Sequence, residues 1–473
     1  MAKSFYITTT LPYINNEPHV GFALEVVRAD IIARYHLSLG EDVFFNTGTD
    51  EHGLKILQKA TEQNISPQEY ADKKSKIFSD LIEKLDIWPE INFIRTTDKK
   101  HIKAAQHFWK ICKDNGYIYK KKYKAKYCIG CELEKTDSEL IAGECPLHPG
   151  QQLEIIEEEN YFFRFSSFQD KLLELYKKNP EFILPDYRLK EIYNFVSSGL
   201  SDFSISRLKD KMPWGIEVPG DKKQVIYVWF DALVNYLTAI GWPEDMEKFK
   251  KYWPVIQYCG KDNLRQQSAM WQAMLLAAGL SNSKKIIING FITADGKKMS
   301  KSLGNVISPF TLIDEYGTDA LRYYLTRHIN LFDDSDYSDA RFKEIYNAHL
   351  ANGLGNLVSR IMKLSSQYLN QTPFYEINCP EEYHNFMNNY NLNEAINFIW
   401  QKIGSMDETI SVRKPFELIK ISPAEGEKIL IDLVKDLAII GKMLEPFMPK
   451  TASRIISLVR ENKFPEQPLF LRK

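Results

Sequence analysis

The sequence predicts an α/β protein in which a doubly wound, Rossmann-like parallel sheet is split by an insertion and followed by an all-α helical bundle. Three observations support this prediction. Strand and helix patterns alternate over residues 4–46 and again over 224–292, a cysteine cluster lies between them, and strand patterns stop near residue 337. Such alternation is typical of parallel sheets that are covered by helices on both faces.

The first block of the sheet begins at the N-terminus. Residues 4–10 form a strand-like run, and a turn rich in proline and asparagine follows it. Apolar residues then recur at helical spacing from Val20 to Tyr35, and Gly40 offers a C-terminal cap. Residues 42–46 make the next strand, and a TGTDEHG loop follows it.

The second block repeats this rhythm downstream. We expect strands at 224–229, 254–259 and 285–292, with one helix after Asp231 and another that ends near residue 278. Because the segment between the blocks breaks the rhythm, it is interpreted as an insertion. The expected domains are a first sheet half at 1–113, a connective insertion with a zinc knuckle at 114–223, a second sheet half at 224–292, a connecting region at 293–340 and a helical domain at 341–473.

The composition excludes several classes of protein. A chain of 473 residues with 44% apolar residues can bury large cores, so disorder is not expected. The formal net charge of -1 does not indicate a nucleic-acid partner, so any RNA contact would use local patches. No apolar run approaches the roughly 20 residues of a membrane-spanning helix, and the first ten residues do not resemble a signal peptide. Six cysteines, three of them at metal spacing, favour a reducing cytoplasm.

A histidine and a glycine stand at the start of the first predicted helix. The preceding strand ends near Thr10, and ligands of open parallel sheets bind beyond the carboxyl ends of the strands. His19 and Gly21 would therefore lie where helix N–H groups favour a phosphate, and Gly21 would let a flat ring approach the backbone. The alternative is that His19 only caps a core helix, which is the commoner outcome for such a motif in isolation.

A second cationic motif lies far downstream. Residues 298–302 read KMSKS and follow a glycine and a β-branched run. Lys298 and Lys301 would form a doubly cationic clamp for a triphosphate, although a lysine pair in a loop is more often only solvated. The sequence contains no GxxxxGK[ST] motif, so a P-loop is excluded as the nucleotide site.

In this order the two motifs resemble the ATP-binding signatures of the class I aminoacyl-tRNA synthetases. The segments LPY at 11–13, TDEHG at 49–53 and YVWFDA at 227–232 narrow the resemblance to the methionyl-tRNA synthetase family. The resemblance implies catalytic roles for His19, Lys298 and Lys301. It implies ATP binding by His19, Gly21, Phe22, Gly260, Asp262, Lys298, Met299, Ser300, Lys301 and Ser302. It implies methionine binding by Leu11, Tyr13, Asp50, Trp229, Ala232, Leu233, Tyr236 and Gln267. In the same resemblance, Asp50 pairs with the substrate ammonium.

The insertion contains a cysteine and histidine array that predicts a metal site independently. Cys128, Cys131, Cys145 and His148 follow a C-x2-C-x13-C-x2-H pattern. Three thiolates and one imidazole form a closed tetrahedral set that is typical of structural zinc, with no open position for catalysis. Unmetallated thiols and a different metal are the alternatives.

The predicted helical domain carries two segments that resemble the anticodon-binding elements of the family. In GNLVSR at 355–360, Asn356 and Arg360 share one helix face and suit the edges of unstacked bases. In KPFE at 414–417, Phe416 would stack on a base. The alternative is an ordinary bundle helix that carries an asparagine and an arginine.

A run of five lysines at 120–126 lies beside the metal array. We interpret it first as a solvated face, and the competing interpretation is a contact with the tRNA acceptor end.

Three positions depart from the family pattern. Phe22 stands where a second histidine is usual, Gln267 stands where a sulfur-facing histidine is expected, and Phe416 replaces a tryptophan. A glutamine amide can still donate to a thioether, although it does not titrate. These changes keep the chemical type of each site and could alter rate, ATP affinity or discrimination.

The resemblance implies a methionine–tRNA ligase. Such an enzyme activates L-methionine with ATP, assisted by Mg²⁺, and transfers it to the 3′-terminal adenosine of tRNA(Met), including the initiator, in the cytoplasm. One alternative is a sister class I ligase, although the short insertion leaves no room for a large editing domain. Another is a catalytically retired tRNA-binding homologue, which Phe22 and Gln267 would permit. Because the chain ends soon after the bundle, we expect a monomer.

Overall fold

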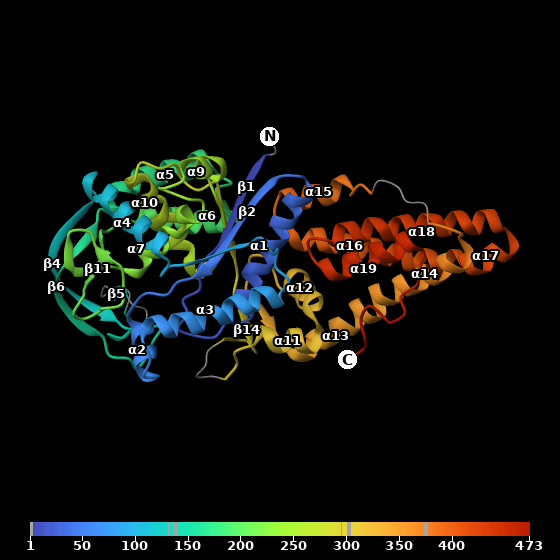
Figure 1. Cartoon of the computed structure of the whole chain (residues 1–473), viewed down its shortest axis with the longest axis horizontal. Coiled ribbons are helices and arrows are strands. Elements are labelled where there is room, and N and C mark those ends of the chain that lie inside the picture. The colour runs from blue at the N-terminus through green and yellow to red at the C-terminus, as the bar shows by residue number, and fades with distance from the viewer. Residues whose placement is uncertain (1–2, 131–132, 136–139, 295, 300–303, 373–376) are drawn as a thin grey trace.

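The largest sheet of the protein has six strands, and each neighbouring pair is parallel (Figure 1). The computed structural model describes residues 3–130, 133–135, 140–294, 296–299, 304–372 and 377–473. In spatial order the strands are β3 (Asn92–Arg95), β2 (Asp42–Thr49), β1 (Ser4–Thr9), β12 (Ile256–Gly260), β13 (Lys285–Asn289) and β7 (Ile183–Leu184). The predicted parallel sheet is confirmed. The strand order reverses between β1 and β12, which creates a switch point there.

Side chains on the two faces of this sheet enter two separate cores. Ile7 and Ile287 belong to one core, and Tyr6 and Ile286 belong to the other. Because alternate residues of a strand point to opposite faces, the sheet is buried on both sides. The helices before residue 280 are α1 (Val20–Ser38), α2 (Leu54–Glu62), α3 (Pro67–Lys84), α4 (Lys99–Asp114), α5 (Gln169–Lys178), α6 (Asp186–Ser197), α7 (Val228–Ala232), α8 (Asn235–Thr238), α9 (Met246–Tyr252) and α10 (Trp271–Ala277).

The segment between the halves contains two antiparallel sheets in addition to α5 and α6. The strand predicted at 224–229 ends at Ile226 and pairs with strands of this segment, so it does not join the parallel sheet, and residues 228–232 are helical. Conversely, β7 extends the parallel sheet from within that segment. Local alternation predicts a strand but not its partner, which long-range packing decides. These sheets contain β4 (Ile118–Cys128), β5 (Leu133–Lys135), β6 (Glu154–Phe163), β8 (Phe203–Ser204), β9 (Ser206–Leu208), β10 (Glu217–Val218) and β11 (Asp221–Ile226).

The lysine run lies on β4, directly opposite an acidic stretch of β6. Lys122 is opposite Glu159, and the ammonium of Lys124 is 4.0 Å from the carboxylate of Glu157. Opposite charges on neighbouring strands stabilise the pairing and reduce the local positive field. This arrangement supports the interpretation of the run as a solvated face.

The chain downstream of the sheet forms a helical bundle that extends away from the sheet (Figure 1). Within the described ranges, the last strand ends at Tyr337, as the sequence predicts. The strands and helices after β13 are β14 (Ile292–Ala294), β15 (Lys297–Lys298), α11 (Pro309–Tyr316), α12 (Thr318–Arg327), β16 (Ser335–Tyr337), α13 (Asp339–Ile345), a π-helix (Tyr346–Gly355), α14 (Asn356–Tyr368), α15 (Glu381–Asn388), α16 (Leu392–Arg413), α17 (Pro415–Ile421), α18 (Pro423–Leu444) and α19 (Pro449–Glu461). No helix among the described residues is both long and apolar enough to cross a membrane. The domain boundaries stay predictions.

Two fully buried arginines join α1 to the region that precedes the bundle. Arg28 donates to backbone carbonyls of the 325–331 segment. Arg322 lies 2.7 Å from the carboxylate of Asp30 and donates to carbonyls at 446–447, between α18 and α19. Because both buried guanidinium groups are held by several acceptors, these contacts fix the connecting region and one end of the bundle against α1.

Candidate functional site

A cavity of about 500 Å³ opens at the carboxyl edge of the parallel sheet, at the switch point. Its wall includes Thr10 after β1, Asp50 after β2, Gly260 at the end of β12 and Asn289 at the end of β13. Side chains from separate parts of the sequence meet there because all parallel strands end at the same edge.

Every predicted methionine-binding residue lines this cavity, namely Leu11, Tyr13, Asp50, Trp229, Ala232, Leu233, Tyr236 and Gln267. The predicted ATP-binding residues His19, Gly21, Phe22, Gly260, Asp262 and Met299 line it too. The backbone of Lys298 lies in β15, and Ser300, Lys301 and Ser302 fall outside the described residues. Two sets of residues that the sequence assigned to different ligands thus share one cavity.

His19 is the N-cap of α1. Its Nδ1 accepts a hydrogen bond of 3.0 Å from the backbone N–H of Gly21. A Cβ at position 21 would lie 2.7 Å from the imidazole, so only glycine allows this ring to cover the backbone. Since Nδ1 accepts, the neutral imidazole carries its proton on Nε2, which is then a donor. The capping role and the ligand role therefore use different nitrogens of one ring.

Phe22 also faces the cavity, although most of its ring is buried. The ring packs edge to face against Phe78 of α3, with centroids 5.1 Å apart. The residue that replaces the usual second histidine therefore contributes mainly to the core beneath the cavity.

The downstream motif is close to the start of α1 through Met299 and through the segment that follows the motif. The backbone N–H of Val20 donates to the carbonyl of Ile307 over 3.1 Å. Met299 of the motif packs against the core that contains α1 and lines the same cavity as His19.

The LPY segment is held against the loop that carries Asp50. Tyr13 and Asp50 form an isolated parallel bridge, and the Asp50 N–H donates to the Pro12 carbonyl over 3.0 Å. This backbone contact brings Tyr13 and Asp50, a buried residue that is 7% exposed, to the same wall.

The residues after Asp50 support the loop rather than face the cavity. The carboxylate of Glu51 is fully buried and accepts two hydrogen bonds, of 2.7 and 2.9 Å, from Arg95. His52 lies 3.1 Å from the buried carboxylate of Asp231. Burial alone would raise the pKa of Asp231, but His52 and His101 outweigh it and lower the pKa below its usual value. The TDEHG loop is therefore anchored on both sides.

Among the cavity residues that the sequence did not predict is the acidic residue Glu25 of α1. Its carboxylate accepts hydrogen bonds from the Thr10 N–H over 2.7 Å and the Gly260 N–H over 3.1 Å, so it joins the ends of β1 and β12. Burial raises the pKa of Glu25 to about 8, and the nearby Asp262 adds to this effect. The available signal was an acidic residue inside an otherwise apolar stretch of helix.

Comparisons with known proteins agree on one family. The family model described as "tRNA synthetases class I (M)" matches residues 5–154 and 148–362. A methionine--tRNA ligase of Thermotoga maritima is 40% identical, over 98% of this chain and 76% of that protein. One of Brucella suis is 38% identical, over 97% of this chain and 92% of that protein.

Solved structures give the same result. The methionyl-tRNA synthetase of Mycobacterium tuberculosis in complex with methionyl-adenylate superposes with a TM-score of 0.90 at 35% identity, and the match covers 96% of this chain and 94% of that one. The free form of the Mycobacterium tuberculosis enzyme gives a TM-score of 0.84 at 31% identity, over 100% of this chain and 99% of that one. The chain belongs to the class I methionyl-tRNA synthetases. As a member of this family it is a ligase that forms aminoacyl-tRNA.

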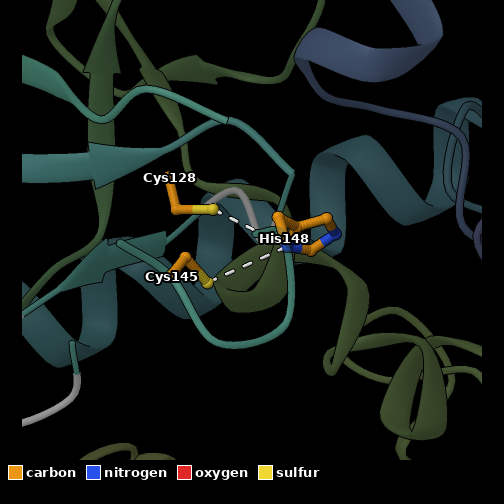
Figure 2. Close-up of side chains that lie close together, drawn as sticks. All are labelled: Cys128, Cys145 and His148. Carbon is orange, nitrogen blue, oxygen red and sulfur yellow. Dashed lines mark hydrogen bonds between the residues drawn. The ribbon is translucent and has the colours of Figure 1, made fainter. Parts of the chain in front are cut away.

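Three of the four predicted metal ligands of this family member lie together (Figure 2). The His148 Nδ1 is 3.7 Å from the Cys128 sulfur and 3.9 Å from the Cys145 sulfur, and the three ligand atoms lie within 4.8 Å of one another. Tetrahedral zinc would hold sulfur and nitrogen atoms about 3.6 Å apart. The described residues therefore fit a Cys/Cys/His metal site, while Cys131 lies outside the described residues.

The knuckle is closely packed and tied to the cavity wall. A Cβ at Gly130 would lie 2.4 Å from the His148 ring, so the turn requires glycine. The ammonium of Lys55 at the start of α2 donates to the Gly130 carbonyl, and Lys55 also lines the cavity. This contact connects the metal site to the loop that carries Asp50.

The predicted anticodon residues lie on the bundle, away from the cavity. Asn356 and Arg360 are exposed on α14, and Arg360 is paired with Asp407 of α16. Phe416 lies on the short helix α17 and is 38% exposed. The structure thus presents all three side chains to solvent.

Proposed function

We propose that this chain activates L-methionine with ATP and transfers it to tRNA(Met). A carboxylate oxygen of methionine attacks the α-phosphorus of ATP, and pyrophosphate leaves as methionyl-adenylate forms. The 2′-hydroxyl of the terminal adenosine then attacks the carbonyl carbon, and AMP leaves. The observation that carries this proposal is the shared cavity, which both motif sets line at the switch point.

The phosphate side of this reaction is assigned to the start of α1 and the KMSKS segment. His19 Nε2 and the N–H groups at the helix start would stabilise charge on the α-phosphate, together with Lys298 and Lys301. Gly260 and Asp262 would contact the nucleoside. Because phosphoryl transfer needs little covalent help, positioning and electrostatics supply most of the acceleration.

The amino-acid side of the reaction is assigned to the aromatic part of the cavity. Asp50 would pair with the methionine ammonium, and the side chain would lie among Tyr13, Trp229 and Tyr236. A thioether is long and polarisable and gains from contact with aromatic rings. A cavity with a buried carboxylate at Asp50 and aromatic walls suits this substrate better than a small branched one.

Metal ions have two separate roles in this proposal. Zinc would be held by Cys128, Cys131, Cys145 and His148 and would stabilise the fold of the knuckle. Mg²⁺ would arrive with ATP and neutralise phosphate charge.

The bundle is proposed to read the anticodon. Asn356 and Arg360 would hydrogen-bond base edges, and Phe416 would stack on a base. The tRNA partners would be elongator and initiator tRNA(Met), the enzyme would act as a monomer, and its location would be the cytoplasm, where tRNA is charged for translation.

The direct test is amino-acid-dependent ATP–pyrophosphate exchange with methionine, leucine, isoleucine, valine and cysteine. We expect exchange with methionine and less than about 1% of that rate with the others. Exchange with another of these amino acids would point to a sister ligase. No exchange with any of them, from zinc-loaded protein, would identify a retired homologue.

A further inference from the structure

A hydrogen-bonded chain of buried polar side chains, called the polar chain below, connects the loop before β13 with the cavity. Its members are neutral amides and one hydroxyl, and each is at most 5% exposed: Gln272, Ser283, Gln257 and Gln267. Neutral buried groups of this kind are costly unless they are paired, and every pairing has a direction from donor to acceptor. The direction of the polar chain can be worked out from its two backbone contacts.

The orientation of the Gln272 amide is decided by the backbone. The N–H of Ser283 donates to Gln272 Oε1 over 3.0 Å, and Gln272 Nε2 donates to the carbonyl of Gln267 over 2.9 Å. A backbone N–H can only donate and a carbonyl can only accept. Exchanging the oxygen and nitrogen of Gln272 would therefore break both contacts.

The orientation of Gln272 influences which atom of each following side chain donates. Gln272 Nε2 also donates to Ser283 Oγ over 3.1 Å, so the Ser283 hydroxyl directs its own proton to Gln257 Oε1, 2.7 Å away. Gln257 Nε2 then donates to Gln267 Oε1 over 2.5 Å, and Gln267 Nε2 donates to the Tyr236 hydroxyl over 2.8 Å. In this orientation the Ser283 proton has an acceptor and each contact joins a donor to an acceptor.

Tyr236 lies at the end of the polar chain and lines the cavity. Its hydroxyl accepts a hydrogen bond of 2.8 Å from Gln267 Nε2, and the side chain of Gln257 also interacts with it. Burial raises the pKa of Tyr236 well above its ordinary value, with Cys259 adding to the effect, so the phenol keeps its proton. That proton is available to a group inside the cavity.

We propose that Gln257, Ser283 and Gln272 are positioning residues that turn the Tyr236 proton toward the bound side chain, so that the cavity selects an amino acid with an acceptor atom at that point. This inference rests on the proposed function, in which the acceptor is the thioether sulfur of methionine. Norleucine has a methylene group in place of that sulfur and nearly the same shape, but no acceptor. A site built to donate a hydrogen bond disfavours an analogue that cannot accept it.

The test measures kcat/KM for methionine and for norleucine by ATP–pyrophosphate exchange and compares their ratio between variants. Gln257→Met keeps the volume but cannot orient Gln267, whose oxygen is then able to accept the Tyr236 proton. We expect the ratio to fall about fivefold, with norleucine changed by less than about twofold. Ser283→Ala removes one contact of the polar chain and should lower the ratio about two- to threefold.

Two further variants distinguish a change in the orientation of the Tyr236 hydroxyl from a general loss of activity. Asn282 donates to Gln272 but carries no proton toward the cavity, so Asn282→Ala should leave the ratio unchanged. In a Tyr236→Phe background, Gln257→Met should lower the ratio no further, because the hydroxyl that it orients is absent.

The inference is overturned if Gln257→Met and Ser283→Ala reduce both amino acids alike, or if the ratio falls equally in the Tyr236→Phe background. Should Gln257→Met fail to fold, Ser283→Ala decides the question. If the wild-type protein exchanges with methionine and the variants keep the wild-type ratio of methionine to norleucine kcat/KM, this inference alone is refuted. Wild-type protein without methionine-dependent exchange refutes the proposed function and this inference together.

Discussion

The side chains of the cavity and those of the bundle surface differ in how firmly they are oriented. In the cavity, His19, Asp50 and Glu25 are each held by backbone contacts before any ligand is present. On the bundle, Arg360 and Phe416 are exposed, and Arg360 is paired with an acidic side chain that a base would have to displace. A small substrate makes few contacts, so it binds well only to groups that are already oriented. A large RNA makes many contacts, so its binding energy can be distributed over exposed, adaptable groups.

This difference predicts that a substitution in one region leaves the function of the other region unchanged. Changes in the cavity should alter amino-acid activation, and changes on the bundle should alter only the use of tRNA. Four measurements test this separation.

The largest effect is expected at the cavity from Lys298→Ala. Loss of one cation that stabilises the transition state should slow single-turnover adenylate formation by about 10²-fold or more. The matched control is Lys297→Ala, the neighbouring lysine that stands outside the KMSKS motif, and its rate should stay within about twofold. Equal rates for both variants and the wild type would remove Lys298 from the mechanism.

On the bundle, Phe416→Ala should lower kcat/KM for tRNA without affecting activation. Loss of one stacked base contact corresponds to roughly a 5- to 150-fold decrease, while pyrophosphate exchange should be unchanged. Ile421→Ala is the matched control, since Ile421 is an exposed apolar residue of the same helix, 83% accessible. A loss of exchange in the Phe416 variant would show that the two regions are not separable.

The metal knuckle lies beside the cavity and should affect it only through Lys55. Removal of zinc by a chelator, or Cys145→Ala, should raise KM for methionine about two- to tenfold and leave kcat within twofold, because a hydrogen bond to the Gly130 carbonyl is weakened. Lys55→Met should reproduce the change in KM while the protein retains about one zinc ion per chain. A fall in kcat on zinc removal would instead place the metal closer to the chemistry.

The smallest effect is expected at the joint between the two regions, where His328 ends α12. Burial lowers the pKa of His328 to about 3, and Arg327 and His349 add to the effect. Between this value and its ordinary pKa of about 6.5, the unfolded chain binds a proton that the folded chain does not. The contribution of His328 to stability is therefore complete above about pH 6.5 and is lost as the pH falls.

Urea unfolding at pH 7 and pH 5 measures this loss. After allowance for the partial exposure of the ring, we expect a decrease of about 1 kcal/mol for the wild type that is absent in His328→Gln. An equal decrease in both proteins would assign the pH dependence to other groups.

Much of this architecture could be predicted from local patterns. The helix from Val20, the strands around 4–9 and 256–260 and the helical C-terminal region follow from apolar periodicity, which is a property of neighbouring residues. The sequence motifs around His19, Asp50 and Trp229 contain residues that line the cavity. By itself the sequence therefore determined the type of these elements and many of the side chains at the switch point, whereas the long strands β4 and β6 were not predicted.

Contacts between distant segments were decided only by the tertiary structure. The pairing of β11 with β9 and β10, the role of Glu25 across two strand ends and the direction of the polar chain from Gln272 to Tyr236 have no local signature. Each depends on which groups packing brings within hydrogen-bonding distance, and on the requirement that every buried donor and acceptor be paired. Periodicity specifies the face that a residue occupies, whereas packing specifies the partner that it meets there.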